Sequence, residues 1–283
     1  MQLEELTVGF IGAGNMAEAI AGALISANTV VASNILMGDI DEGRLKRMAE
    51  AYAVQTTTDN LDVFVRSKVV VLAVKPQKVA EAVSALTQGS GYAVAARKQF
   101  ISICAGVRIE KLESMLYPPL SEKDRKRLPI IRVMPNTPAL VLEGMSVMSP
   151  NRNATAKDLD LTRTLLESMG RVLPFEETLL DAVTAMSGSG PAYLFYLAEA
   201  MERAGEKLGF SGPESRTLTL QTLKGAVALL EKTGAPPEAL RRKVTSPEGT
   251  TQAATDVLDA AKVMETVVDA VCAAARRSEE LSG

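Results

Sequence analysis

The sequence predicts an α/β fold with a doubly wound parallel sheet, followed by an all-α region. Three observations carry this prediction. Short apolar, β-branched runs alternate with helical stretches from Leu6 to about Glu176. The strand-like runs stop after about Thr178, and only helical periodicity follows. A glycine-rich turn joins the first strand-like run to the first helical stretch.

Seven apolar runs are the expected strands of the first region. In chain order they are LTVGFIG, NILMGD, VVVLAV, QFISICA, IIRVMP, MSVMS and RVLPF. Runs that are apolar throughout indicate strands buried on both faces, which is typical of a parallel sheet covered by helices. Helices are expected at MAEAIAGALIS, DEGRLKRMAEAY and AKDLDLTRTLLESMG. The polar segment from Tyr117 to Arg127 indicates an exposed insertion before a strand.

The second region is expected to be helical throughout. The expected helices cover residues 182–209, 215–232, 237–243 and 249–278, with glycines and a proline pair between them. This change of pattern predicts two domains, residues 1–177 and residues 178–283. The helices are rich in alanine, leucine and valine, and periodicity leaves open whether such faces form a core or an interface.

Composition excludes several function classes. The 283 residues are 47% hydrophobic and 23% charged, with a formal net charge of −3, which is typical of a soluble globular protein and leaves no basic surplus for nucleic acid. The apolar runs are too short to span a membrane, and the acidic start is unlike a signal peptide. Two cysteines far apart in sequence, Cys104 and Cys272, favour a cytoplasmic location.

Histidine is absent from the sequence. This excludes a Ser-His-Asp triad, a Cys-His pair and a His-ligated metal, and we expect no metal site. If the chain is an enzyme, we expect a cofactor to supply its difficult chemistry.

The glycine-rich turn matches the pattern G-x-G-x-x-G/A at Gly12, Gly14 and Ala17. It follows a strand and opens an alanine-rich helix, which is the context of a dinucleotide-binding, Rossmann-type turn. The first glycine permits the tight turn, the second lets the backbone approach a pyrophosphate, and the alanine allows close helix–strand packing. The alternative is a strand–helix turn without a ligand.

The second expected strand ends in Asp39. An acidic residue at that tip accepts hydrogen bonds from the adenosine ribose, so it leans slightly towards NADH over NADPH. Two alternatives stay open. Asp39 or Asp41 could merely cap the next helix. Basic residues that follow closely could still bind a 2′-phosphate; they are Arg44, Lys46 and Arg47.

Several further segments occur in one order along the chain, from Phe10 to Ala254. They are FIGAGNMAEAI, LAVKPQ, ISICAGV, RVMPNTPALVLEG, DAVTAMSGSGPAY and VTSPEGTTQAA. Together they resemble the pyrroline-5-carboxylate reductase family, which makes proline. The resemblance implies a Rossmann domain, a helical dimerisation domain, reduction of a cyclic imine with NADPH or NADH, and an interlocked dimer, with a larger ring of dimers possible.

The resemblance also implies a set of cofactor contacts at the ends of the expected strands. They are Ile11, Gly12, Ala13, Gly14, Asn15, Met16, Ala17, Asn60, Ala73, Val74, Lys75, Pro76, Cys104, Ala105 and Gly106. For Cys104 we favour simple core packing over a redox role. Lys75 could be only a solvated loop charge. Asn136 could orient the nicotinamide side or hold a turn.

For the substrate, the resemblance implies that the loop VTSPEGTT holds a carboxylate. Ser246 is expected at the N-cap of a helix, with Pro247 at its first position. The backbone N–H groups near Gly249 and Thr250, with the hydroxyls of Ser246 and Thr251, would then bind the carboxylate. The resemblance places Thr251 beside the imine nitrogen, as hydrogen-bond partner and possible proton relay. The alternative is an ordinary helix cap.

The resemblance further implies that Glu177 reaches the same site, the alternative being a surface charge before a helix. In SGSGPAYLF, Pro191 is expected in the first turn of another helix. The substrate loop departs from the family pattern NVTSPGGTT, because Lys243 replaces the asparagine and Glu248 a glycine. We expect Glu248 to point outward, because a carboxylate that points inward would repel the carboxylate of the substrate.

Other functions remain open at this stage. A reductase of a related cyclic imine would differ first at Lys243 and Glu248. A β-hydroxyacid dehydrogenase-like enzyme would need a lysine early in the helix GSGPAYLFYLAEAMERAG, and none occurs before Lys207. A dinucleotide-sensing protein without activity could use the same fold.

Overall fold

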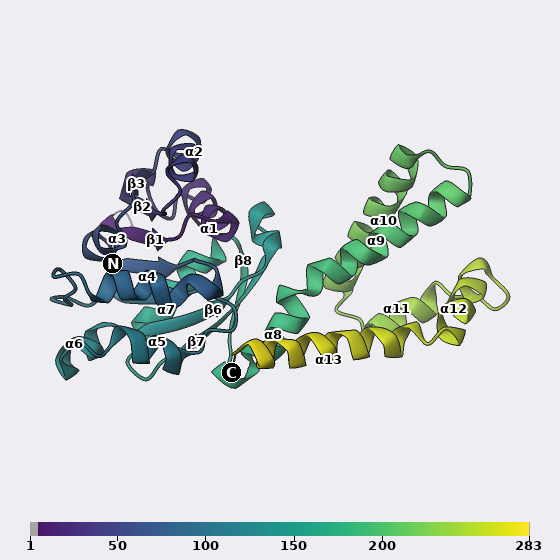
Figure 1. Cartoon of the computed structure of the whole chain (residues 1–283). Helices are drawn as coiled ribbons and strands as arrows, with labels where there is room; N and C mark the ends of the chain where they lie inside the picture. Colours follow the sequence, from purple (N-terminus) through teal and green to yellow (C-terminus); the bar gives the residue numbers. More distant parts are fainter. Residues whose placement is uncertain (1–4, 283) are drawn as a thin grey trace. The chain divides into compact units, whose positions relative to one another are not determined.

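The computed structural model describes residues 5–282, which form two compact units (Figure 1). The first unit contains the chain up to Gly188 and the last stretch from Ala274. The second unit is Ser189–Ala273. The expected division into domains 1–177 and 178–283 stays a prediction. The compact units themselves divide after Gly188, and the end of the last helix belongs to the first unit.

The first unit is built on one eight-stranded sheet in the order β3-β2-β1-β4-β5-β6-β7-β8. Its strands are β1 (Val8–Ile11), β2 (Ile35–Gly38), β3 (Gln55–Thr57), β4 (Val69–Leu72), β5 (Gln99–Ser102), β6 (Ile130–Met134), β7 (Gly144–Pro150) and β8 (Gly170–Pro174). The order of β1 to β6 is that of a doubly wound dinucleotide-binding sheet. All seven expected strands are present.

The sheet differs from the expected parallel sheet at one edge. Strand β7 runs antiparallel to β6, and β8 runs parallel to β7. Only a short turn that includes the 3₁₀ segment Thr137–Val141 joins β6 to β7. A parallel pairing would need a longer crossover, so the short connection favours the antiparallel one. Strand β3 was not expected, because its residues are polar and largely exposed.

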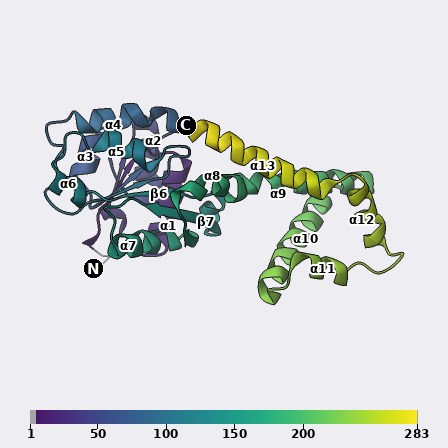
Figure 2. The same cartoon turned by 90° about the horizontal axis from the view of Figure 1, so that it is seen from below.

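Helices cover both faces of the sheet (Figure 2). They are α1 (Asn15–Ser26), α2 (Glu42–Tyr52), α3 (Asn60–Arg66), α4 (Val79–Thr87), α5 (Ile109–Leu116), α6 (Glu122–Arg127), α7 (Ala156–Glu167) and the short α8 (Leu180–Val183). Alternate strand residues enter two cores. Val8 and Phe10 of β1 pack with α1, α2 and α7, while Ile11 packs with α3, α4 and α5. This explains why the strands are apolar throughout.

The segment from Tyr117 to Arg127 is not the exposed insertion that we expected. Tyr117 and Leu120 are buried in the core on the α5 side. The Tyr117 hydroxyl donates to the carbonyl of Leu128 at 2.7 Å and accepts from Asn151 and Asn153. The two prolines, Ser121 and the polar α6 lie at the surface, while the aromatic and leucine side chains anchor the segment.

The second unit consists of α9 (Gly190–Lys207), α10 (Gly212–Thr233), α11 (Pro237–Lys243), α12 (Thr250–Ala260) and the first part of α13 (Val263–Ser282). Two expected helices are each interrupted. A π-helical turn, Thr184–Gly188, lies between α8 and α9. Lys262, whose φ is 52°, separates α12 from α13. Pro191 lies in the first turn of α9 as expected.

The helices of the second unit leave their apolar faces exposed. Within residues 189–273, no large hydrophobic side chain is buried, while Phe195, Tyr196 and Val268 are among many that are exposed. Faces of this kind favour an interface over a core. Among residues 5–282, no helix is long and apolar enough to cross a membrane.

Candidate active site

Gly12 is required by the backbone of the turn after β1. Its φ is 98°, and a Cβ atom there would lie 2.8 Å from the carbonyl oxygen of Ala73. Its N–H donates to the carbonyl of Gly38 at 2.7 Å, which joins the ends of β1 and β2. Only glycine adopts this φ without strain and also leaves room for the carbonyl of Ala73 at the end of the neighbouring strand.

Gly14 lies two residues on, and its surroundings are open. A Cβ atom built at Gly14 meets nothing within 4 Å. Gly14 is the N-cap of α1, and no side chain caps the first N–H groups of that helix. Uncapped N–H groups beside open space are what a pyrophosphate requires. The turn therefore fits a dinucleotide.

Asp39 holds the glycine-rich turn and does not cap α2. Its Oδ2 accepts from Ala13 N at 2.7 Å, and its Oδ1 accepts from Asp41 N at 3.0 Å. The cap of α2 is Asp41, which accepts from Arg44 N at 2.9 Å. The two acidic residues thus differ in function: Asp41 caps α2, whereas Asp39 binds the turn. The partly exposed Asp39 lies at the position of a ribose-binding carboxylate.

The other predicted cofactor residues follow neighbouring strand ends of the same sheet. Ala73, Val74, Lys75 and Pro76 follow β4, and Ala73 N donates to Ile11 O at 2.8 Å. Cys104, Ala105 and Gly106 follow β5. Asn60 begins α3 after β3, and its Oδ1 lies 3.6 Å from the position of a Cβ on Gly38. Residues 11–17, 73–76 and 104–106 therefore lie along the carboxyl edge of β1, β4 and β5, at the switch point of the sheet.

Cys104 is a packing residue in this arrangement. Its side chain is 3% exposed, and its Sγ donates to the carbonyl of Val74 at 3.3 Å. Burial raises the pKa of the thiol to about 11, so the group stays neutral near pH 7. The thiol thus ties the loop after β5 to the loop after β4.

Asn136 holds a turn. Its Nδ2 donates to Ser187 O at 3.1 Å, and its Oδ1 accepts from Met145 N at 2.8 Å. These two bonds join the end of β6 to β7 and to the π-helical turn. They support the turn-holding alternative.

Glu177 is an ion-paired residue of the first unit and not a free surface charge. Its Oε1 accepts from Ile109 N at 2.7 Å and from the Arg132 guanidinium at 3.0 Å. Arg132 is only 3% exposed. Sequence reasoning missed Arg132, although a charge inside the apolar run IIRVMP was a visible signal. The pair holds Glu177 at the start of α5, just after the loop that contains Cys104.

The loop before α12 differs from the expected cap. The N-cap is Gly249, and α12 begins at Thr250. Ser246 and Pro247 instead lie in a turn that Gly249 N closes by donating to Ser246 O at 3.1 Å. Glu248 takes a φ of 57°, which no helix residue adopts, so the helix starts only after it.

The turn nevertheless presents groups that can bind an anion. No side chain caps α12, so its first N–H groups have no partner in the helix or from a cap. A Cβ atom on Gly249 would lie 2.5 Å from the Ser246 hydroxyl. Glycine at this position therefore allows the hydroxyl to lie close to the start of the helix. Thr251 is half-buried in the first turn, and Glu248 is exposed, as an outward placement requires. This loop belongs to the second unit.

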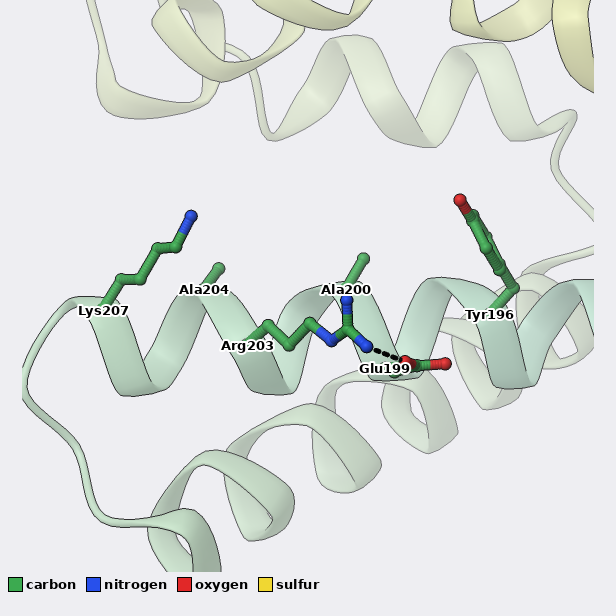
Figure 3. A pocket seen from close by; sticks show the side chains of 6 residues that line it. All are labelled: Tyr196, Glu199, Ala200, Arg203, Ala204 and Lys207. Carbon is green, nitrogen blue, oxygen red and sulfur yellow. Dashed lines mark hydrogen bonds and ion pairs between the residues drawn. The ribbon is translucent and has the colours of Figure 1, made fainter.

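A shallow pocket in the second unit lies on one helix. Its lining residues are Tyr196, Glu199, Ala200, Arg203, Ala204 and Lys207. All come from α9, where Tyr196, Ala200, Ala204 and Lys207 point to one side and Arg203 pairs with Glu199 (Figure 3). None of the predicted site residues lines it. Among residues 5–282, no group of three or more cysteine and acidic side chains is placed to hold a metal.

The strand order, the open glycine turn and the carboxylate at the tip of β2 define a dinucleotide-binding fold. Two family models match the chain. Residues 7–106 match the NADP oxidoreductase, coenzyme F420-dependent, family, and residues 177–281 match the pyrroline-5-carboxylate reductase dimerisation family. The second match supports self-association through the helical region.

Known proteins resemble the chain over nearly its whole length. A pyrroline-5-carboxylate reductase of Pseudomonas aeruginosa is 39% identical over 276 residues, 97% of this chain and 96% of the relative. A solved pyrroline-5-carboxylate reductase from Coxiella burnetii has a TM-score of 0.87 and 32% identity, and covers 99% of this chain and 100% of its own. A Plasmodium falciparum pyrroline carboxylate reductase with NADP bound has a TM-score of 0.87 and 31% identity, with 99% of each chain covered. The chain belongs to the pyrroline-5-carboxylate reductase family, which confirms the resemblance.

Proposed function

We propose that the chain reduces 1-pyrroline-5-carboxylate to L-proline with NADPH or NADH, the last step of proline biosynthesis. The observation that carries this proposal is the likeness to pyrroline-5-carboxylate reductases over nearly the whole chain. The open turn at Gly14 supports it independently, because it fits the dinucleotide that the reaction requires. The β-hydroxyacid dehydrogenase-like alternative is not favoured.

The cofactor residues share one edge of the sheet in the first unit. We assign the pyrophosphate to the turn of residues 11–17, the ribose to Asp39, and the nicotinamide side to residues 73–76 and 104–106, with Asn60 next to Gly38. When bound, NAD(P)H supplies the hydride. The protein contributes orientation and the exclusion of water.

The substrate residues are assigned to the loop before α12, namely Ser246, Gly249, Thr250 and Thr251, together with Glu177. The uncapped N–H groups of α12 and the Ser246 hydroxyl suit a carboxylate. In the reaction one hydride adds to the carbon of the C=N bond, and one proton ends on the nitrogen. We assign Thr251 as the hydrogen-bond partner of that nitrogen. We assign Glu177 to substrate binding, and its ion pair with Arg132 fixes the position of its carboxylate.

Assembly and location extend this proposal. The exposed apolar faces of the second unit support a dimer, and we propose that dimers join into a larger ring. We also propose a cytoplasmic location, supported by the two free cysteines, Cys104 and Cys272. Chromatography with light scattering tests the ring, and a mass of one dimer contradicts it.

The direct test is a turnover assay with the purified chain. We expect 1-pyrroline-5-carboxylate to oxidise NADH or NADPH and to yield L-proline. A parallel assay with the six-membered imine piperideine carboxylate tests the related-imine alternative. Faster turnover of the six-membered ring would replace the proposed substrate, and no turnover with either cofactor would overturn the proposal.

Thr251→Ala tests the proposed catalytic residue. Loss of a hydrogen-bond partner at the imine nitrogen is expected to lower kcat/KM by about 100-fold, while the Kd of NADH stays within about threefold of the wild-type value. Thr266→Ala is the matched control, because the Thr266 hydroxyl donates only to the carbonyl of Lys262. Wild-type kcat/KM in Thr251→Ala would remove Thr251 from the mechanism.

A further inference from the structure

Arg44 is a basic residue just after the tip of β2, yet its guanidinium is already engaged. Its Nε donates to the carbonyl of Ala13 at 2.6 Å, inside the glycine-rich turn. Its Nη2 forms an ion pair with Glu18 Oε2. The side chain of Arg44 is 18% exposed. It is thus a fixed part of the turn and not a free surface charge.

Glu18 is itself held in place. It lies in the first turn of α1, and its Oε1 accepts from the Tyr52 hydroxyl at 3.2 Å. Tyr52 ends α2, and its ring lies 3.1 Å from the position of a Cβ on Gly22 of α1. The two carboxylate oxygens of Glu18 therefore have different partners, Tyr52 and Arg44, and the ion pair is preorganised.

The other two basic residues nearby are poor substitutes for Arg44. Lys46 extends into solvent, with its side chain 77% exposed, and its Nζ lies 3.9 Å from Glu50 Oε1. Arg47 is exposed one turn further along α2. A 2′-phosphate is best bound by a guanidinium that can offer two parallel N–H groups. In the structure the Nε and Nη2 of Arg44 are occupied by Ala13 and Glu18, and the carboxylate of Glu18 offsets the charge of the guanidinium.

We propose that Glu18 determines the cofactor preference, because it withholds Arg44 from a 2′-phosphate and so makes the chain favour NADH over NADPH. The inference rests on the proposed cofactor site. Asp39 binds the N–H of Ala13, and Glu18 reaches the same residue through Arg44, so a phosphate with nearly two negative charges near Ala13 would be repelled by two carboxylates. The ribose hydroxyls of NADH carry no charge and are not repelled in this way.

Equilibrium binding to the full-length protein tests the proposal without turnover. Titration calorimetry would measure the Kd of NADH and NADPH, and of the fragments 5′-AMP and 2′,5′-ADP, which differ only in the 2′-phosphate. We expect the wild type to bind NADH about tenfold or more tightly than NADPH. Glu18→Gln keeps an acceptor for Tyr52 but loses the charge, so it should tighten NADPH and 2′,5′-ADP by about tenfold. The Kd of NADH should change by less than about threefold.

Two further variants separate release of Arg44 from a change in fold or in overall charge. The double variant Glu18→Gln/Arg44→Gln should lose the gain for NADPH, because the gain requires the guanidinium. Glu122→Gln removes an equally charged residue of an exposed ion pair on α6 and should leave the ratio of the two Kd values unchanged. If Glu18→Gln lowers the melting temperature, Glu18→Asp replaces it in the same titration. We expect Glu18→Asp also to tighten the binding of NADPH, because its shorter side chain holds Arg44 less well.

Different results overturn different claims. Equal Kd values of NADH and NADPH in the wild type, or the same ratio in Glu18→Gln as in the wild type, would overturn the role of Glu18 and leave the cofactor site intact. Failure of the wild type to bind either dinucleotide would overturn the cofactor site itself and the role of Glu18 with it.

Discussion

Gly12 and Gly14 lie in the same turn, but the backbone requires glycine only at Gly12. The motif predicted both positions, and the structure distinguishes them through their surroundings: Gly12 is closed off by Ala73, whereas Gly14 faces open space. For Asp39 the structure removes the capping alternative, because Asp41 caps α2, and the ribose contact stays a prediction. At this scale the motif is informative because each of its positions has one steric or hydrogen-bonding reason.

Gly14→Ala separates ligand binding from folding. Because its Cβ meets no protein atom within 4 Å, we expect a melting temperature close to that of the wild type. The methyl group would occupy the path of the pyrophosphate, so the Kd of NADH should rise by about tenfold or more. Gly12→Ala should instead destabilise the fold by about 1–3 kcal/mol. Calorimetry measures the Kd of NADH, and thermal unfolding measures the stability of the two variants. Wild-type NADH affinity in Gly14→Ala would contradict the assignment of the turn.

Glu248 occupies a backbone conformation that suits glycine. Its φ of 57° is costly for a side chain with a Cβ, so Glu248→Gly should raise the free energy of unfolding by up to about 1 kcal/mol. Glu248→Val should lower it by about 1 kcal/mol, because β-branched residues rarely adopt this region. Urea unfolding measures both variants. A less stable Glu248→Gly would show that the carboxylate makes a compensating interaction.

At the scale of elements, strands were easier to predict than short helices. The seven apolar runs were found because a sheet covered on both faces needs continuous apolar strands. The polar edge strand β3 carries no comparable signal, and α3 is only seven residues long. The break at Lys262 was missed because neither glycine nor proline marks it, and the helical periodicity continues across it.

The end of α13 is fixed to the first unit by hydrogen bonds that sequence could not reveal. The buried Asp181 accepts from the hydroxyls of Ser278 at 2.7 Å and Ser282 at 2.8 Å. The carbonyl of Leu281 lies 3.3 Å from the position of a Cβ on Gly106, in the predicted nicotinamide loop. The two hydrogen bonds join residues about a hundred positions apart, so no local pattern predicts them.

Removal of both hydroxyls should loosen this helix end. In Ser278→Ala/Ser282→Ala the Asp181 carboxylate loses two donors, which should cost about 1–3 kcal/mol. Amide hydrogen exchange should rise in residues 274–282, and the Kd of NADH should rise with it, because the loop at Gly106 loses its support. Arg277→Ala, which removes only an exposed ion pair, is the control. Unchanged exchange in the double variant would show that other contacts hold the helix end.

At the scale of the whole molecule, the two units bury their apolar residues differently. The first unit has two large cores, whereas no large hydrophobic side chain is buried within residues 189–273. Sequence periodicity predicted apolar faces on these helices but could not tell a core from an interface. The exposure of the faces, with the match to a dimerisation family, indicates self-association.

The candidate site was predicted only in part, for a related reason. The loops that we assign to the cofactor follow from local motifs at strand ends. The pairs Arg132–Glu177 and Arg44–Glu18 join elements that are distant in sequence, so their partners appear only in the fold. The position of Ser246 was predicted wrongly because Glu248 shifts the start of α12 to Thr250.

Lys98 gives the stability of the protein a pH dependence. Its Nζ donates to the carbonyls of Phe64 and Ser67, and burial lowers its pKa to about 8 from an ordinary value of 10.5. Between these values the unfolded chain binds more protons, so the contribution of Lys98 to stability rises with pH. The free energy of unfolding of the wild type, relative to Lys98→Met, should increase from pH 8 to pH 10. A constant difference would contradict the lowered pKa.

Transfer of deuterium from the cofactor to the product is the sharpest test of the proposed reaction. The protein is incubated with 1-pyrroline-5-carboxylate and NADH carrying deuterium on one face of the nicotinamide C4, with each face labelled in turn, and the product is analysed by mass spectrometry. We expect L-proline with one deuterium at C5 from one of the two labelled cofactors and none from the other. Absence of proline, or proline without deuterium from both, would contradict the proposed reaction.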